Sequence, residues 1–362
     1  MTQQASGARL CLLETRCVRP NRLLLPGIAL LLGASSILWL ASRNRTAREA
    51  ALAAQARQLP TRHGPIEYAD WGEGPPIVVL HGAGGGFDQG RLLAEAVGDA
   101  RGEAGNAPGR RWIAVSRFGY LGSPLPPDAS PTAQAQALAD LLDGLGIARA
   151  DVLAMSGGMP PALQFAARFP DRTRRMVLLS SAPFTPFAPD EQARPIPTRA
   201  YAALLGNDTL YWLLARTARG QLAAAYDARP ELLATAPPAD RAFVDALIDS
   251  FPPASRRIAG LGNEGSAIAP GEHYPLAAIR APVLLIHARD DRLNPFPIAE
   301  ALAAGIPSSR LLAQDRGGHL LIGHHDELRR VLADHLGRPE RLADIDALGQ
   351  VPGQSETGSP PS

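Results

Sequence analysis

Short apolar runs alternate with longer amphipathic segments from Thr61 onward. The runs are rich in Val, Ile and Leu, as buried strands are, whereas the Ala- and Leu-rich segments between them have helical spacing. The predicted strands are IVVL (77–80), WIAV (112–115), DVLA (151–154), MVLL (176–179), VLLI (283–286) and RLLA (310–313). This alternation predicts an α/β fold with a mostly parallel, doubly wound sheet whose strands are joined by crossover helices.

One connection in this pattern is too long for a single crossover helix. Roughly 100 residues separate the strand MVLL from the strand VLLI, where a crossover needs only a fraction of that length. Segments with helical apolar spacing fill this interval, separated by Pro and Gly. The pattern predicts a mostly helical cap over residues 184–275, inserted into a core made of residues 61–183 and 276–338.

The N-terminal region carries a different pattern. Residues 23–42 contain no charge and have the length of a membrane-spanning helix, so we expect a transmembrane anchor after an N-terminal arm (1–22). A cleaved signal peptide is the alternative, because arginines precede the apolar run and small residues end it. The anchor would make the membrane a partner and place the catalytic part in the periplasm or outside the cell, with a cytoplasmic orientation as the alternative.

Two further segments flank the predicted core. Residues 43–60 are rich in Ala and Arg and predict a helical linker. Residues 339–362 end in Pro, Gly and Ser without apolar periodicity, which predicts a disordered tail.

Composition excludes several functions. The net charge of +1 gives no electrostatic reason to expect nucleic acid as a partner. Every basic residue apart from histidine is Arg, which removes a Schiff-base or P-loop lysine. The two cysteines, Cys11 and Cys17, precede the apolar segment, and the histidines lack metal-ligand spacing, so we expect no disulfide in the core, no metal and no cofactor.

Ser156 is the candidate nucleophile. It follows the strand DVLA directly and precedes GGMPPAL, where Pro160 and Pro161 suit the first turn of a helix. A strand, a sharp turn and a helix around one serine would project its hydroxyl above the sheet edge and point the helix N-terminus at it. The surrounding AMSGG fits the G-x-S-x-G pattern except that Ala154 replaces the first glycine.

A serine hydroxyl needs a base and an acid that orients the base. His319 follows a predicted strand on the Gly-rich loop QDRGGHLLIG and is the best-placed histidine. The segment LLIHARDDRLNP offers two carboxylates after a strand end: Asp291 is the preferred acid and Asp290 is the alternative.

The remaining requirement is a pair of backbone N–H groups for an oxyanion. The loop HGAGGG follows a predicted strand, and Ala83 or Gly84 would donate one hydrogen bond there. Gly157, the residue after the candidate nucleophile, would donate the other. A dinucleotide loop is the alternative, but the spacing is not G-x-G-x-x-G; His81 is expected to support the loop structurally.

The run from residue 61 to residue 336 resembles the α/β-hydrolase superfamily. Five motifs occur in the family's order: VVLHGAGGG, SRFGYLGS, LAMSGGMPPAL, IHARDDRLNP and GGHLLIGHHDEL. The resemblance implies a triad of Ser156, Asp291 and His319 under a cap. The sequence departs from the family at Ala154 and at Ala288, where glycine is common; SRFGYLGS is expected only to shape the pocket.

These observations predict a serine hydrolase, with a carboxylic ester as the preferred substrate, small or lipophilic, and an acyl-enzyme intermediate. Amidase, C–C bond hydrolase, acyltransferase and perhydrolase chemistry use the same constellation. Two alternatives are of another class: a non-enzymatic ligand receptor of the same fold, and a membrane-tethered interaction protein.

Overall fold

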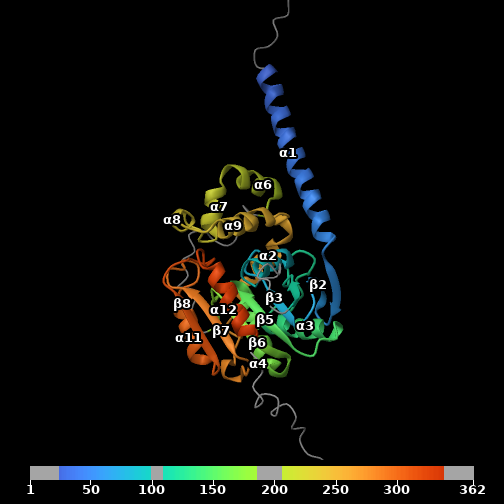
Figure 1. Cartoon of the computed structure of the whole chain (residues 1–362). Helices are drawn as coiled ribbons and strands as arrows, with labels where there is room; N and C mark the ends of the chain where they lie inside the picture. Colours follow the sequence, from blue (N-terminus) through green and yellow to red (C-terminus); the bar gives the residue numbers. More distant parts are fainter. Residues whose placement is uncertain (1–23, 99–108, 186–205, 338–362) are drawn as a thin grey trace, which may run out of the picture.

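One eight-stranded sheet forms the centre of the molecule (Figure 1). The computed structural model of the protein describes residues 24–98, 109–185 and 206–337. The strands are β1 (Arg57–Thr61), β2 (Gly64–Trp71), β3 (Pro76–Leu80), β4 (Arg111–Val115), β5 (Ala150–Met155), β6 (Thr173–Leu179), β7 (Val283–Ala288) and β8 (Ser309–Gln314). Their order across the sheet is β1-β2-β4-β3-β5-β6-β7-β8, and all neighbours from β4 to β8 are parallel. All six strands predicted from apolar runs are confirmed.

The two-residue period of a strand divides the core into two layers. Val79 and Leu153 point to one face, where they pack in the same apolar cluster as residues of α2 and α12. Val78 and Val152 point to the other face, in the cluster that includes α3, α4 and α11. The helices are α2 (Phe87–Val97), α3 (Pro131–Gly144), α4 (Met159–Arg168), α11 (Pro297–Gly305) and α12 (His325–Gly337). The central strands are covered on both faces, which explains why they read as continuous apolar runs.

The antiparallel edge of the sheet was not predicted. β1 pairs with β2, and β2 pairs with β4, in both cases antiparallel. β1 begins within the segment 43–60 that the sequence predicts to be a linker, so the sheet begins four residues before the expected core start at Thr61. Its sequence RQLPT has one large apolar residue and a proline, and most of its residues are exposed or half-buried, so it carries no pattern of a buried strand.

The described residues between β6 and β7 are mostly helical. Their helices are α6 (Asp208–Thr217), α7 (Arg219–Ala225), α8 (Pro230–Leu233), α9 (Pro238–Ser250) and α10 (Ile258–Asn263). Figure 1 shows α6, α7, α8 and α9 gathered over one end of the sheet. Residues 186–205 of the expected cap lie outside the described part of the chain.

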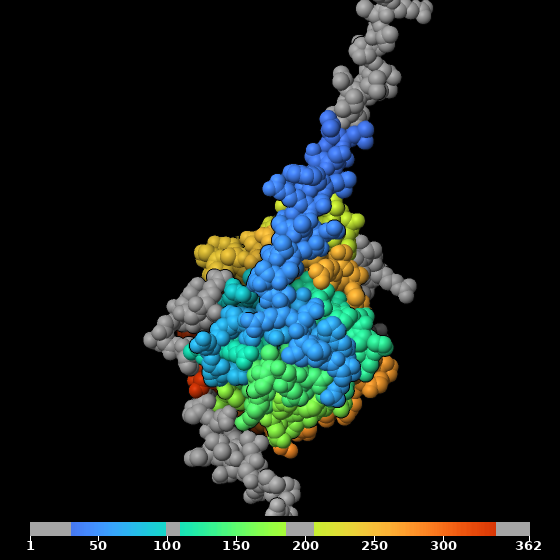
Figure 2. All heavy atoms as spheres, turned by 90° about the vertical axis from the view of Figure 1, so that its right-hand side faces the viewer, coloured from blue at the N-terminus to red at the C-terminus, as the bar shows by residue number. Residues whose placement is uncertain are grey.

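Helix α1 (Leu24–Ala53) extends away from the sheet and cap at its N-terminal end (Figures 1 and 2). In the part of the chain that the structure describes, no helix is long and apolar enough to cross a membrane. The transmembrane anchor expected over 23–42 is therefore not supported. The helix continues past residue 42 into a charged stretch that contacts both the core and the cap. Arg48 pairs with Asp88 of α2, and Arg45 lies 3.5 Å from Asp208 of α6. The expected arm (1–22) and tail (339–362) lie outside the described residues.

Candidate active site

Ser156 occupies a sharp turn between β5 and α4. Its φ of +49° is uncommon for a residue with a side chain and marks a constrained position. A short 3-10 turn, η1 (Ser156–Gly158), leads directly into α4. A Cβ at Gly158 would lie 2.4 Å from the carbonyl oxygen of Leu80, so only glycine fits there. The serine thus lies at the carboxyl end of β5, beside the first turn of α4, as the sequence predicts.

His319 and Asp291 meet across two neighbouring loops. Asp291 follows β7, His319 follows β8, and His319 Nδ1 lies 2.9 Å from Asp291 Oδ2. Oδ1 of the same carboxylate accepts hydrogen bonds from the backbone N–H of Leu293 (2.8 Å) and of Asn294 (2.9 Å). The carboxylate is therefore fixed by the backbone of its own loop and faces the imidazole.

The pKa values of this pair move in opposite directions. Burial alone would raise the pKa of Asp291, but the adjacent His319 and the hydrogen bonds from His287, His319 and Asn294 outweigh burial and hold that pKa well below its usual range. Burial also opposes protonation of His319, yet the carboxylates of Asp291 and Asp227 raise the pKa of the imidazole above its ordinary value. The site therefore favours an ionised Asp291 and stabilises an imidazolium at His319.

Asp290 faces away from the imidazole. Its Oδ2 accepts a hydrogen bond from Arg229 Nη2 at 2.5 Å, and its Oδ1 accepts one from the backbone N–H of Gly318 at 2.9 Å. Of the two carboxylates that the sequence offers, the structure places Asp291 beside His319.

Asn294 is a site residue that the sequence analysis missed. Its Nδ2 donates hydrogen bonds to Ser156 Oγ at 3.4 Å and to the Ser180 carbonyl at 3.1 Å. Ser156 has no hydrogen bond to His319 among the contacts of the described residues, and the hydroxyl is oriented by the Asn294 amide. Catalytic hydrogen bonds are often long before substrate binds, so His319 stays the candidate base for Ser156. The only sequence cue for Asn294 was its place three residues after Asp291.

The loop after β3 passes close to the serine. A Cβ at Gly82 would lie 3.3 Å from Ser156 Cβ. The N–H of Gly84 donates to the hydroxyl of Tyr120 at 3.2 Å, and this leaves Ala83 as the candidate oxyanion donor of the loop. Gly157, the second predicted donor, follows Ser156 in η1.

His81 holds this loop in place. Its Nδ1 lies 2.7 Å from the Gly82 carbonyl, and its Nε2 accepts a hydrogen bond from the backbone N–H of Arg117 at 3.1 Å. Burial and the Arg117 charge lower the pKa of His81 well below its usual value, so the imidazole is neutral. Its contacts agree with the structural role expected for it.

A cap carboxylate, Glu264, lies beside the η1 turn that carries Ser156, and the sequence did not reveal this contact. Glu264 begins the short turn η5 (Glu264–Ile268), and its Oε1 lies 2.5 Å from Arg117 Nη2 and accepts a hydrogen bond from the Tyr120 hydroxyl. A Cβ at Gly157 would lie 2.5 Å from Glu264 Oε2. Arg117 and Tyr120 therefore tie the cap to the core directly over the predicted oxyanion donor, a role beyond the pocket shaping expected for SRFGYLGS.

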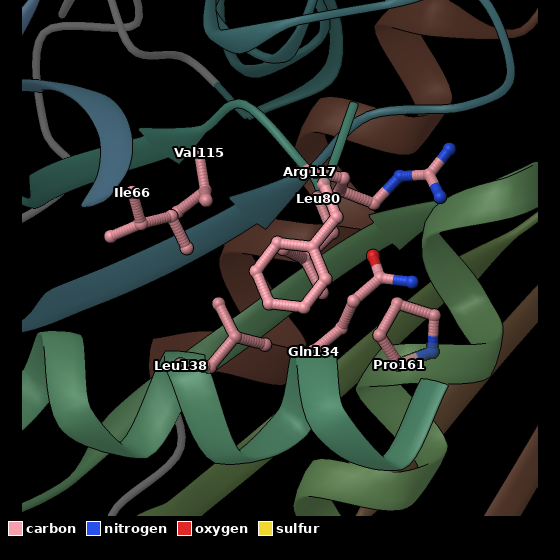
Figure 3. Close-up of a pocket in the computed structure, with 8 residues that line it drawn as sticks. Ile66, Leu80, Val115, Arg117, Gln134, Leu138 and Pro161 are labelled. Atoms are coloured by element: carbon pink, nitrogen blue, oxygen red, sulfur yellow. The ribbon is translucent and has the colours of Figure 1, made fainter. Parts of the chain in front are cut away.

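A small pocket lies between the sheet, α3 and α4 (Figure 3). Its lining residues are Ile66, Leu80, Val115, Arg117, Phe118, Gln134, Leu138 and Pro161. Ser156, Asp291 and His319 do not line it, so we assign it to core packing and not to catalysis. Among the described residues, no group of three or more His, Cys, Asp or Glu side chains is arranged to hold a metal.

Comparison with known proteins identifies the family. The profile of the alpha/beta hydrolase fold family matches residues 75–326, and the chain belongs to this family. It is similar to 2-hydroxymuconate semialdehyde hydrolase of Pseudomonas putida, with 28% identity over 294 residues that cover 77% of this chain and 91% of that protein. A hydrolase of Paraburkholderia phymatum, named for 2-hydroxy-6-oxononadienedioate and 2-hydroxy-6-oxononatrienedioate, is 28% identical over 282 residues, 75% of this chain and 91% of that protein.

Solved structures agree on the fold. An alpha/beta hydrolase fold protein from Nakamurella multipartita has a TM-score of 0.66 and 29% identity, covering 78% of this chain and 98% of that one. A thermophilic esterase from Thermogutta terrifontis has a TM-score of 0.54 and 21% identity, covering 77% and 96%. The family and the curated relatives support hydrolase chemistry for the chain.

Proposed function

We propose that this hydrolase acts through Ser156 as nucleophile. In this mechanism, Ser156 Oγ attacks an acyl carbon while His319 Nε2 takes its proton, and Asp291 holds the other ring nitrogen and stabilises the imidazolium. The N–H groups of Ala83 and Gly157 receive the oxyanion. Water then releases the acyl group, with His319 as its base.

The contact between His319 Nδ1 and Asp291 Oδ2 carries this proposal. A buried carboxylate 2.9 Å from Nδ1 fixes the proton on that nitrogen and leaves Nε2 free to act as base. The pair lies on the loops after β7 and β8, at the same sheet edge as Ser156 after β5. These are the parts that acyl transfer to a serine requires.

We propose a carboxylic ester, small or lipophilic, as the first substrate class. Ester carbonyls suit the Ser156 mechanism without a further catalytic group, since the leaving alcohol takes its proton from His319. The cap contributes buried apolar residues such as Leu232 to the cluster that also contains Leu320 and Leu321, the residues after His319. Apolar side chains therefore pack beside the His319 loop, which suits a lipophilic substrate.

Cleavage of a C–C bond is the second candidate, and the relatives favour it. The names of the two curated relatives above refer to hydrolysis of 2-hydroxymuconate semialdehyde and of 2-hydroxy-6-oxo dienedioates and trienedioates. Such a substrate also presents a carbonyl to a nucleophile. Arg117, the buried cation beside Gly157, is already paired with Glu264 and is therefore not free to bind a substrate carboxylate unless Glu264 moves.

A substrate panel separates these candidates. The full chain would be assayed with p-nitrophenyl esters of short and long acyl chains and with a 2-hydroxy-6-oxo dienoate, as wild type and as Ser156→Ala. Ser181→Ala is the matched control, because Ser181 is a buried serine whose Oγ has no hydrogen-bond partner among the described residues. Serine-dependent ester turnover supports an esterase and serine-dependent dienoate cleavage supports a C–C hydrolase; absence of both refutes the proposal.

A further inference from the structure

One cap residue, Asp227, contacts the backbones of two loops: the acid loop after β7, which carries Asp291, and the base loop after β8, which carries His319. Asp227 follows α7 and is buried, with 3% of its surface exposed. Its Oδ2 accepts a hydrogen bond from the backbone N–H of Arg292, next to Asp291, and another from the backbone N–H of His319; both are 3.1 Å long. One carboxylate oxygen therefore bridges the two loops that carry the acid and the base.

The backbone conformations of Asp227 and Gly318 allow this contact. Its φ of +59° places it in the left-handed region, which is strained for a residue with a side chain. Gly318, just before His319, has a φ of +61°, and a Cβ there would lie 2.8 Å from Asp227 Oδ2. Only a glycine at 318 lets the cap carboxylate approach the His319 amide.

A second pair of charges links the same segments. Arg229 Nε lies 3.2 Å from Asp227 Oδ1, and Arg229 Nη2 donates to Asp290 Oδ2 at 2.5 Å. Asp290 in turn accepts the N–H of Gly318. The cap turn 227–229 thus reaches the base loop twice, once directly and once through Asp290.

We infer that Asp227 is a positioning residue that fixes the distance between the loops of Asp291 and His319 and adds a second negative charge near the imidazole. This inference rests on the proposed function of Ser156, His319 and Asp291. It assigns the cap a part in assembling the acid–base pair, in addition to covering the site.

The charges that face this cluster set its electrostatics. Asp291 and Asp227 both face His319, and both raise the pKa of its imidazole. Burial raises the pKa of Asp227 itself, and the nearby charge of Asp291 adds to this rise. The hydrogen bonds from the backbone N–H groups of Arg292 and His319 and the charge of Arg229 oppose it, and the net effect is a raised pKa. Glu231 also approaches Arg229, at 3.8 Å. Removal of the Asp227 charge should therefore lower the pKa of His319.

Two substitutions separate geometry from charge. Asp227→Asn keeps an oxygen that can accept both N–H groups but loses the charge, whereas Asp227→Ala loses both. We expect the His319 imidazole, followed by NMR in the full chain, to titrate at a lower pH in both variants than in the wild type, because the Asp227 charge that raises its pKa is gone. We expect hydrogen exchange at the amides of Arg292 and His319 to become faster in Asp227→Ala only.

Kinetics add a readout that a general loss of stability would not give. We expect Asp227→Ala to lower kcat about tenfold or more with little change in KM, and Asp227→Asn to restore most of kcat while its acid limb stays shifted to lower pH. Asp240→Asn is the matched control. Asp240 is a cap carboxylate with 1% exposure that accepts a hydrogen bond from the N–H of Gly323 in the loop after β8, and it does not contact His319.

The outcomes are distinct. An unchanged His319 titration in both Asp227 variants, or the same shift in Asp240→Asn, would overturn the inference. If the wild type shows no serine-dependent turnover, the proposed function fails, and the NMR titration and the amide exchange still decide whether Asp227 couples the two loops.

Discussion

His319 and Asp291 are held together from loops 28 residues apart in sequence, with Nδ1 of the imidazole 2.9 Å from Oδ2 of the carboxylate. The neighbouring Asp290 contributes to the same region but binds Arg229 and the Gly318 amide. The two adjacent carboxylates thus make different contacts, so their substitution should have different effects.

Asp291→Asn should abolish most of the activity. An amide at this position no longer stabilises the imidazolium and can reverse the tautomer of His319, so we expect kcat to fall by about 10³–10⁴-fold. Asp290→Asn should cost far less, on the order of tenfold, because it only weakens the contacts to Arg229 and Gly318. Steady-state kinetics of the two variants test this, and equal losses would refute the assignment of Asp291.

The pH dependence of activity follows from the raised pKa of His319. The base must be neutral to accept a proton from Ser156, so kcat/KM should fall as the pH drops through the pKa of His319 in the free enzyme. Because Asp291 and Asp227 raise this pKa, we expect the midpoint of the acid limb above the ordinary histidine value of about 6.5. A midpoint at or below that value in a kcat/KM profile would contradict the electrostatics described here.

Gly157→Ala should disturb the contact between Glu264 of the cap and the η1 turn that carries Ser156. The new Cβ would lie 2.5 Å from Glu264 Oε2 and 3.0 Å from Arg117 Nη2, so the ion pair must move. We expect a loss of about 1–3 kcal/mol in unfolding free energy and at least a tenfold lower kcat/KM. Gly265→Ala is the control, since a Cβ there meets nothing within 4 Å. The prediction fails if denaturant melts and kinetics do not distinguish the two variants.

The central strand should dominate the stability of the core. Leu153 of β5 is 1% exposed and packs in the apolar cluster on the face covered by α2 and α12, so Leu153→Ala should lower the unfolding free energy by about 2–5 kcal/mol. Leu125 is 44% exposed, and Leu125→Ala should change it by less than about 0.5 kcal/mol. Urea titration of both variants gives the comparison, and similar losses would refute this view of the core.

The fold was predictable where local pattern and burial coincide. The parallel strands are covered on both faces and are therefore apolar throughout, and Ser156, Asp291 and His319 each follow one of them. Ala154 also has a physical place: it is fully buried in β5 between β3 and β6, and its methyl group packs in the apolar cluster on the α4 side.

The remaining site residues depend on tertiary packing. Asp227 and Glu264 lie in the cap, and no spacing in the sequence tells which cap carboxylate will reach His319 or Gly157. Asn294 is close to Asp291 in sequence, but its contact with Ser156 depends on how the loop after β7 turns toward β5. The edge strand β1 escaped prediction because its residues are mostly polar and partly exposed.

Covalent labelling of the serine tests the central claim most directly. The full chain would be treated with a fluorophosphonate, and the modified peptide would be identified by mass spectrometry in wild type, Ser156→Ala and Ser181→Ala. We predict one adduct on Ser156 in the wild type and in Ser181→Ala, and none in Ser156→Ala. An unlabelled wild type, or a label that persists in Ser156→Ala, would contradict the role of Ser156 as the activated nucleophile.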